Sequence, residues 1–180
     1  MTATAAQNED MGLVLRPMVR DDLRAVLRIE QQSPTAAWTR TMFLAELGLK
    51  KRRYLTAHLG NKCVGFGGLI AVAGEGHIAN LGVDEQFRRQ GIATHMMLGI
   101  VHAATELDCR ALTLEVAVSN HAAQALYCRF GFAPAGIRKN YYSASNEDAL
   151  VMWAHDTDLD QYRERIQKIQ GTLSSVGVGQ

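Results

Sequence analysis

The sequence predicts a single α/β (α+β) domain, with a mixed, mostly antiparallel sheet of about seven strands and helices on both faces. Three observations favour this fold class. The chain has 180 residues, a usual length for one domain. Segments with an apolar period of two alternate with segments of helical period. Three consecutive strand-like segments are also joined by short polar or glycine-containing turns, which is typical of an antiparallel meander.

The first half of the domain predicts a strand, two helices and the three meander strands. A short apolar run ends at Arg16 and Pro17, which favours an edge strand. From Asp21 the apolar residues recur at helical spacing, and a second helical segment begins near Thr39. The expected ranges are 13–15 for the strand, 21–31 and 39–47 for the helices, and 53–59, 63–72 and 77–83 for the meander.

The second half predicts helices and strands in alternation. A long apolar helix follows a glycine-containing loop, and Gly131 ends a second, shorter helix. Two strands around a polar loop close the domain. The expected ranges are 92–107 and 120–130 for the helices, and 111–118, 132–137 and 148–153 for the strands.

These patterns divide the chain into a leader, a domain and an extension. Residues 1–11 carry no apolar run, so we expect a disordered leader rather than a secretory signal, and residues 12–155 form the domain. Residues 156–180 predict an amphipathic helix followed by a flexible tail from residue 174. This helix either packs on the domain or binds a partner. Its apolar stripe consists of Leu159, Tyr162, Ile166, Ile169 and Leu173.

Composition excludes several classes of function. The net charge is +1, so we expect no overall electrostatic attraction to nucleic acid or membranes. The basic run 50–53 is either a solvent-exposed stretch at the start of a strand or a local RNA contact. No apolar stretch is long enough to span a bilayer. The three cysteines are widely spaced, which favours free thiols, a cytoplasmic protein and no metal site. His95 and His102 lie seven residues apart, which we interpret as a surface pattern of one helix.

The loop before the long helix is a candidate phosphate-binding site. A helix N-terminus offers unpaired N–H groups and a positive dipole end, and Gly91 lets a ligand approach the backbone closely. Arg88 and Arg89 add positive charge, and no acidic residue lies between Gln86 and Ala104. The alternative is an ordinary strand-to-helix turn with two exposed arginines.

The segments 81–83 and 88–93 together resemble the acetyl-CoA pyrophosphate loop of the Gcn5-related N-acetyltransferases (GNAT), whose pattern is Q/R-x-x-G-x-G/A. Residues 114–116, 119–120, 125–127, 130–132, 138–142 and 147–149 are similar to the branch that acetylates the N-terminal alanine of a ribosomal protein (RimI). The resemblance covers residues 12–155. It implies a GNAT fold and acetyl-CoA as cosubstrate, bound by Leu81, Gly82, Val83, Arg88, Arg89, Gln90, Gly91, Ile92, Ala93, Thr94 and Asn120.

Glu115 is a candidate general base on residue pattern alone. It lies in the middle of a predicted strand, on a face whose neighbours Thr113 and Ala117 are small. Burial of a lone carboxylate raises its pKa toward the range of a useful base. The alternative is a salt-bridged or edge-exposed glutamate.

Tyr127 is a candidate general acid, and Asn120 a candidate helix cap. A tyrosine in this helix is either a residue of the hydrophobic core or a phenol placed to protonate a leaving thiolate. The resemblance implies the second role and makes Glu115 the base of a direct transfer, without a covalent acyl-enzyme. Asn120 precedes the helix as an N-cap residue would, and the resemblance adds a cofactor contact.

The resemblance also implies the acceptor, the N-terminal alanine of ribosomal protein S18. Tyr141 and Tyr142 either frame the peptide or pack within a hairpin. Two features depart from the branch: Ala117 stands where arginine is usual, and the extension follows the last strand. Other protein N-termini, lysines or small amines remain alternative acceptors, and a non-catalytic acetyl-CoA-binding module is the alternative from another functional class.

Overall fold

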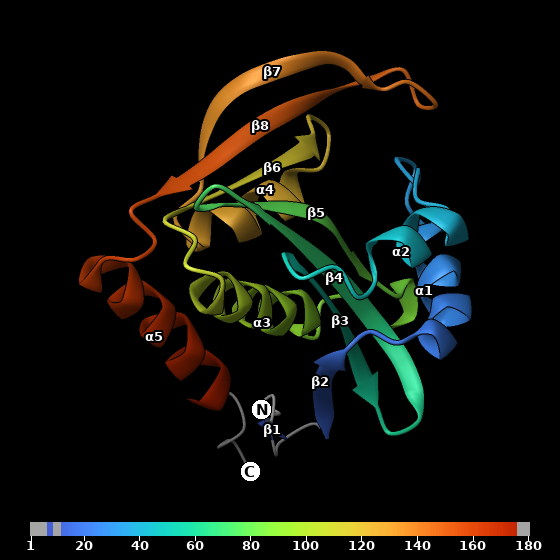
Figure 1. Ribbon diagram of the computed structural model, residues 1–180, viewed down its shortest axis with the longest axis horizontal. Coiled ribbons are helices and arrows are strands. Elements are labelled where there is room, and N and C mark those ends of the chain that lie inside the picture. The colour runs from blue at the N-terminus through green and yellow to red at the C-terminus, as the bar shows by residue number, and fades with distance from the viewer. Residues whose placement is uncertain (1–6, 9–11, 176–180) are drawn as a thin grey trace.

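The strands of the computed structural model join one sheet in the order β1-β2-β3-β4-β5-β6-β8-β7, and the structure describes residues 7–8 and 12–175 (Figure 1). All neighbouring strands pair antiparallel except β5 and β6. The strands are β1 (Gln7–Asn8), β2 (Leu13–Pro17), β3 (Arg52–Leu59), β4 (Lys62–Val72), β5 (Glu75–Val83), β6 (Ala111–Ala117), β7 (Ala133–Tyr142) and β8 (Glu147–His155).

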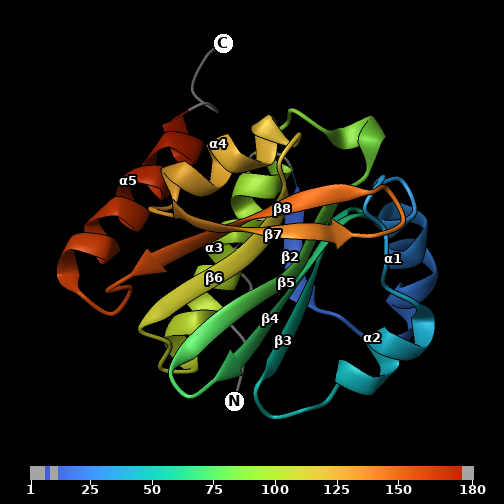
Figure 2. The same ribbon diagram turned by 90° about the horizontal axis from the view of Figure 1, so that it is seen from above.

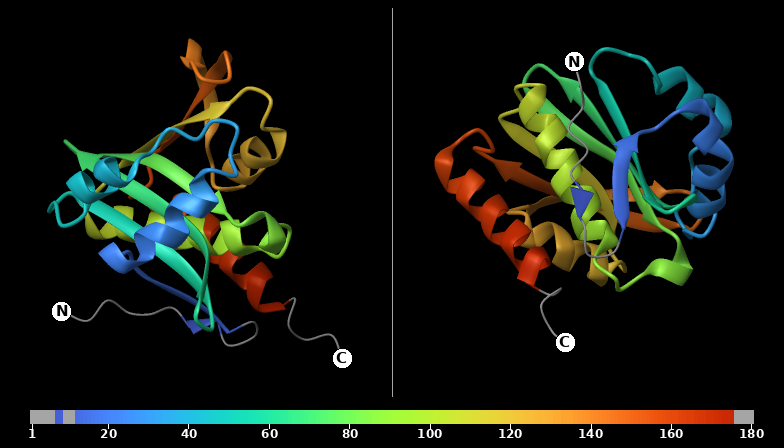
Figure 3. Two further views of the ribbon diagram at one scale, coloured as in Figure 1. Left: turned by 90° about the vertical axis from the view of Figure 1, so that its right-hand side faces the viewer. Right: turned by 90° about the horizontal axis from the view of Figure 1, so that it is seen from below.

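Five α-helices cover the two faces of this sheet (Figures 1 and 3). Helices α1 and α2 pack on one face through a cluster around Phe43 and Phe66. Helices α3 and α4 pack on the other face, where the largest core cluster lies. The prediction of a mixed, mostly antiparallel sheet with helices on both faces is confirmed. The helices are α1 (Leu23–Glu30), α2 (Arg40–Glu46), α3 (Ile92–Glu106), α4 (His121–Arg129) and α5 (Asp160–Ser175).

The parallel pair β5–β6 is short and then opens. Its register runs only from Glu75, paired with Ala111, to His77, paired with Thr113. Beyond His77 the two strands separate toward their C-terminal ends (Figure 2). The second half of β5 therefore pairs with β4 on one side and, within residues 12–175, with no strand on the other.

Helix α5 packs on the domain in this structure. Tyr162 and Ile169 are buried in the same core cluster as α3 and α4. Near its end, Cδ2 of Leu173 lies 3.7 Å from the position of a Cβ built on Gly91. Figure 3 shows α5 beside α3. Of the apolar stripe predicted for this segment, Tyr162, Ile166 and Ile169 thus pack on the domain, whereas Leu159 precedes the helix and is exposed.

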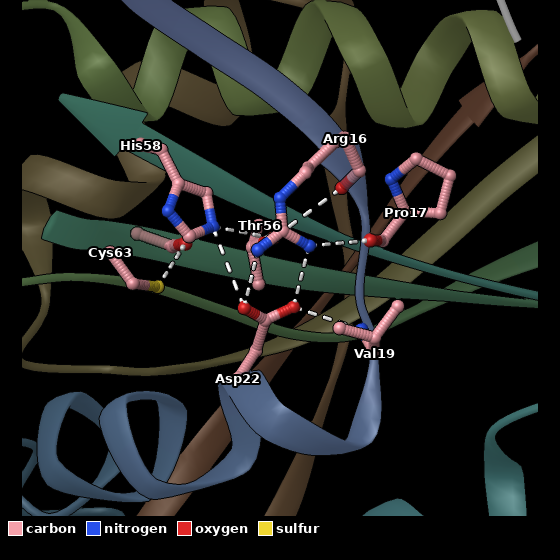
Figure 4. A network of polar contacts seen from close by, with 8 residues as sticks. Arg16, Pro17, Val19, Asp22, Thr56, His58 and Cys63 are labelled. Carbon is pink, nitrogen blue, oxygen red and sulfur yellow. Dashed lines mark hydrogen bonds and ion pairs between the residues drawn. The ribbon is translucent and has the colours of Figure 1, made fainter. Parts of the chain in front are cut away.

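A polar network ties the first long strand to the first helix (Figure 4). The guanidinium of Arg16 donates to both carboxylate oxygens of Asp22, at 2.8 and 2.7 Å. Asp22 also accepts the backbone N–H of Val19 at 2.9 Å, and Nε2 of His58 lies 3.7 Å from it. Burial of the Asp22 carboxyl opposes ionisation, but Arg16 and Val19 outweigh it, and the pKa of Asp22 is lowered.

The structure corrects several expected boundaries. The last two strands are longer than predicted, so residues 140–142, expected in a loop, belong to β7. The register between β7 and β8 shifts between Arg138 and Tyr142, which explains why the strand pattern is broken there. Helix α5 extends to Ser175, past the predicted start of the tail. Most of the expected leader, and tail residues 176–180, lie outside the described residues, whereas Gln7–Asn8 pair with β2.

Candidate active site

The loop from Arg88 to Gly91 brings the backbone to the N-terminus of α3 in a left-handed conformation. Gly91 is the N-cap of α3 and has φ of 78°, a value that favours glycine. Arg89 also has a positive φ of 63°. The first N–H groups of α3 have no acceptor in a preceding helical turn, so they are available to an anion. The side chains of Arg88 and Arg89 are exposed beside them.

The predicted residues of this loop divide into two kinds. The side chains of Ile92 and Thr94 are buried, so only their backbone can face a ligand. Gln90 is exposed and Ala93 is half-buried. Gly91 has room around it: a Cβ there would meet Leu173 and His95 only at 3.7 Å or more. The loop therefore fits a pyrophosphate through backbone N–H groups and two guanidinium side chains.

The opening between β5 and β6 continues from this loop. Leu81, Gly82 and Val83 are half-buried at the C-terminal end of β5, past the last residue that pairs with β6. A Cβ on Gly82 would lie 2.5 Å from the ring of Phe66, so only glycine fits there. An extended ligand arm can pair with this stretch of backbone as a strand would.

Glu115 lies on β6, facing this opening, and it contacts an imidazole and a guanidinium group. Its Oε2 lies 2.6 Å from Nε2 of His77, and its Oε1 lies 3.2 Å from a guanidinium nitrogen of Arg138. The glutamate side chain is 8% exposed, whereas that of Arg138 is 57% exposed. The alternation that predicted Glu115 on the opposite face from Leu114 and Val116 is consistent with their full burial in the core.

The expected direction of the Glu115 pKa was wrong. The hydrogen bond with His77 and the charges of His77 and Arg138 stabilise the carboxylate more than burial destabilises it, so the pKa of Glu115 is lowered. The alternative left open by the sequence, a salt-bridged glutamate, matches the contacts with His77 and Arg138, although the sequence did not identify these partners. The parallel pairing of β5 with β6 brings His77 to Glu115, and a single sequence does not reveal that pairing.

Tyr127 projects from α4 into the core on the same side of the molecule. Its ring packs against Phe132, with centroids 5.9 Å apart. Burial raises the pKa of Tyr127 to about 12. Because of this raised pKa, the hydroxyl keeps its proton at neutral pH, and no hydrogen bond to it is seen among the described residues.

The β7–β8 hairpin brings Tyr142 to the same place. Its hydroxyl donates to the backbone oxygen of Glu115 at 3.2 Å, and burial raises its pKa, with smaller contributions from the nearby Tyr141 and Tyr127. The ring of Tyr141 packs edge-on against Tyr142 and lies 5.5 Å from the Arg138 guanidinium. The paired tyrosines therefore do pack within the hairpin, and in doing so they border Glu115.

Asn120 caps α4, as the sequence predicted. Its Oδ1 accepts the backbone N–H of Ala123 at 3.2 Å, and the side chain is exposed. Ser119 next to it donates its N–H to Glu147 at 2.9 Å. These bonds fix the turn between β6 and α4, on which the positions of both Glu115 and Tyr127 depend.

The surface pattern expected for the α3 histidines was wrong for one of them. His102 is exposed, but His95 is 8% exposed and its Nδ1 lies 2.9 Å from the Gly91 carbonyl oxygen. Helix α3 is apolar on most sides, a signal that predicts burial all round. No cluster of three or more possible metal ligands occurs among the residues that the structure describes.

The geometry supports acid–base chemistry on a ligand held by its phosphates. An ionised carboxylate lies at the opening between β5 and β6, the start of α3 has unpaired N–H groups available to an anion, and a neutral phenol on α4 lies near Tyr142. Within residues 12–175, no helix is both long and apolar enough to cross a membrane.

Known proteins are similar to this chain in sequence and in fold. The sequence profile of the acetyltransferase (GNAT) family matches residues 23–132, more than half of the chain. A Bacillus subtilis protein, provisionally named a ribosomal protein bS18-alanine N-acetyltransferase, is 39% identical over 140 residues, covering 77% of this chain and 93% of that protein. The Escherichia coli (strain K12) enzyme of that name is 34% identical over 135 residues, covering 73% of this chain and 89% of that one. The crystal structure of the Escherichia coli ribosomal-protein-S18-alanine N-acetyltransferase superposes with a TM-score of 0.72 at 29% identity, covering 80% of this chain and 94% of that one.

Proposed function

The chain belongs to the acetyltransferase (GNAT) family, and from this premise we propose that it acetylates the N-terminal alanine of ribosomal protein S18, with acetyl-CoA as cosubstrate. The names of the relatives support the choice of acceptor. The observation that carries the chemistry is the buried Glu115 carboxylate, held between His77 and Arg138 at the opening between β5 and β6. The proposed location is the cytoplasm, which suits three free cysteines.

The cosubstrate site is assigned to the loop and strand described above. Backbone N–H groups at the start of α3, with Arg88 and Arg89, hold the pyrophosphate. The backbone of Leu81, Gly82 and Val83 holds the extended arm, and Asn120 lies at the far side of the opening. When bound, acetyl-CoA supplies an activated carbonyl and a thiolate leaving group.

Glu115 is proposed to accept the proton of the substrate ammonium. A protein α-amine has a pKa of about 7.7–8.0, so about a tenth of it is already neutral at pH 7, unlike a lysine with a pKa of about 10.4. A carboxylate of low pKa is therefore sufficient for this acceptor. His77 and Arg138 keep it ionised, and Tyr141 and Tyr142 border the acceptor.

Tyr127 is proposed to protonate the departing sulfur. Its raised pKa keeps the phenol protonated at neutral pH, so the proton is available to the sulfur as the thioester C–S bond breaks. Transfer is direct, since the amine attacks the thioester carbonyl itself. Cys109 is buried and its thiol pKa is raised by burial, which argues against a covalent acyl-enzyme there.

Mass spectrometry with two peptides tests this function. One peptide begins Ala-Arg-Tyr-Phe, and the other has the same sequence with a blocked N-terminus and an internal lysine. We expect the acetyl group on the free α-amine alone. Label on lysine alone would assign another acceptor, and label on neither, with turnover of a polyamine, would assign a small amine. Binding of acetyl-CoA without any turnover would favour a non-catalytic module.

Matched glutamate variants test the assigned base. Glu115→Gln is expected to lower kcat/KM by about 10²–10⁴-fold, the usual worth of a general base. Glu164→Gln, an exposed residue of α5, is expected to leave it unchanged. If both variants retain full activity, the assignment of Glu115 is wrong even when the acceptor is right.

A further inference from the structure

A groove on the outer side of α1 gathers four arginines. Its volume is about 530 Å³ and it lies between α1, the turn before it and the start of α2. Arg20, Arg24 and Arg28 follow one another at intervals of four residues, so they share one face of the helical segment. Arg40, the first residue of α2, lines the same groove.

The charge of this groove is largely uncompensated. Arg28 is bound to the buried Asp84 at 2.7 Å, but Arg20, Arg24 and Arg40 make no ion pair within the described residues. Asp21 is the single acidic residue that the groove's described lining contains. The whole chain has a net charge of only +1, so three unpaired guanidinium groups at one site are a marked local excess.

The lining indicates what kind of partner fits. Leu23 is buried beneath the groove, and the lining includes no aromatic residue. The residues that contribute most to protein–protein affinity are usually Trp, Tyr and Arg, and of these the groove's lining offers arginine alone. Four guanidinium groups also repel a basic peptide, which excludes a peptide of that charge as the occupant. A nucleic-acid backbone carries regularly spaced negative charges. It needs no aromatic anchor, because its affinity comes from phosphates that cationic side chains neutralise.

We propose that this groove binds the phosphate backbone of single-stranded RNA. The choice of RNA rests on the proposed function, since a ribosomal-protein substrate is met beside RNA. The groove would then hold the enzyme near its acceptor without touching the acceptor itself. This differs from the sequence-based expectation of no direct contact with nucleic acid, which rested on net charge alone.

Salt dependence gives the sharpest test. Binding of a fluorescent oligouridine of about twelve nucleotides is measured by anisotropy between about 50 and 200 mM salt. Three unpaired arginines predict a slope of log K against log salt of about −2, at about −0.7 per phosphate on a single strand. This corresponds to a loss of affinity of about 20-fold over that range. In Arg24→Gln/Arg40→Gln, the slope is expected to fall to about −0.7, the value for one contact.

Control variants separate this site from other basic surfaces. Arg110→Gln/Arg163→Gln removes the same charge from exposed positions elsewhere and is expected to bind RNA like the wild type. The proposal is wrong if the wild type shows no salt-dependent binding, if Lys50→Gln/Lys51→Gln alone removes it, or if an acidic peptide of equal charge binds more tightly than the RNA.

The acceptor assay separates failure of this proposal from failure of the proposed function. Arg24→Gln/Arg40→Gln is expected to acetylate a free peptide at the wild-type rate. If the wild type acetylates the peptide but does not bind RNA, the RNA-binding proposal is wrong and the proposed function stands. Alternatively, the wild type binds RNA, the variant does not, and the wild type does not acetylate the peptide. That result would overturn the proposed acceptor and leave the RNA site standing.

Discussion

The Nε2 atom of His77 lies 2.6 Å from Oε2 of Glu115, although the two residues are 38 positions apart in the sequence. The contact exists because β5 and β6 pair in parallel at their first residues and place both side chains at the point where the strands separate. His77 is thus the residue that most directly controls the ionisation of Glu115.

Removing His77 is expected to change the pH dependence of catalysis. The hydrogen bond with His77 is the largest cause of the lowered Glu115 pKa, so His77→Ala raises that pKa toward its ordinary value. The acid limb of the kcat/KM profile, which reports the free enzyme, then moves to higher pH. Arg138→Gln is expected to move it in the same direction by less. An unchanged acid limb in both variants would show that Glu115 is not the group that limits activity at low pH.

Tyr127→Phe is expected to lower kcat by about 10²-fold or more while leaving the fold intact. Phenylalanine keeps the packing against Phe132, and no hydrogen bond to the hydroxyl is lost among the described residues. Tyr162→Phe is the matched control, because the hydroxyl of Tyr162 is buried without a hydrogen-bond partner within that part of the chain, so its removal likewise breaks no hydrogen bond. Its turnover should equal that of the wild type. Equal kcat values for both variants, with thermal unfolding unchanged, would remove Tyr127 from the mechanism.

Gly91→Ala is expected to weaken acetyl-CoA binding. The residue has φ of 78°, so alanine costs about 1–2 kcal/mol in backbone strain, and its Cβ would stand at the N-cap beside the proposed pyrophosphate position. Gly60→Ala, in the turn between β3 and β4, imposes similar strain at φ of 56° with nothing nearby. Both variants should lose similar stability in urea unfolding, but only Gly91→Ala should raise the KM for acetyl-CoA. A raised KM in both would mean that strain alone explains the effect.

Asp22→Asn is expected to destabilise the protein at neutral pH by about 1.5–3 kcal/mol, the usual worth of hydrogen bonds to a charged group. The pKa of Asp22 is lower in the folded state than in the unfolded chain, so its stabilisation is present above about pH 4 and is lost as the pH falls through the folded value. The difference between wild type and variant should therefore shrink in acid. Urea unfolding at pH 7 and at about pH 3 measures it.

Asp21→Asn provides the control for this prediction. Asp21 precedes Asp22 in the chain, is exposed and makes no ion pair among the described residues. Its substitution should change stability by less than about 0.5 kcal/mol at either pH. A loss at Asp22 that is the same at both pH values would indicate a packing effect rather than the ion pair with Arg16.

Most strands and helices could be predicted from local pattern because each has a clear apolar period. The end of β7 could not, because the register shift between Arg138 and Tyr142 breaks that period. Glu115 could be singled out because a carboxylate interrupts a strand of apolar and small residues. Gly91 could be singled out because a glycine precedes an apolar helix. The partners of Glu115 could not be predicted in this way. His77 and Arg138 reach it through pairings of strands that are distant in sequence, and a single sequence carries no record of those pairings.

The burial of His95 is a second example of a contact that a single sequence does not reveal, because it depends on how the helices pack. Spacing along α3 gives no sign that α5, which begins more than fifty residues later, ends beside the first turn of α3, where Leu173 lies near Gly91. The direction of the Glu115 pKa failed for a related reason. Burial was inferred correctly, but the sign depended on which charges the fold placed beside the carboxylate.

The short pairing of β5 with β6 also bears on how this protein avoids self-association. After His77, backbone groups along one side of β5 have no partner strand within residues 12–175, so the sheet has an open edge in its interior as well as at its ends. Open edges are where strands of other chains add and aggregation begins. Under the proposed function, the arm of acetyl-CoA covers this edge. The cosubstrate would then protect the protein from aggregation, and the fraction that remains monomeric on mild heating should rise with acetyl-CoA concentration.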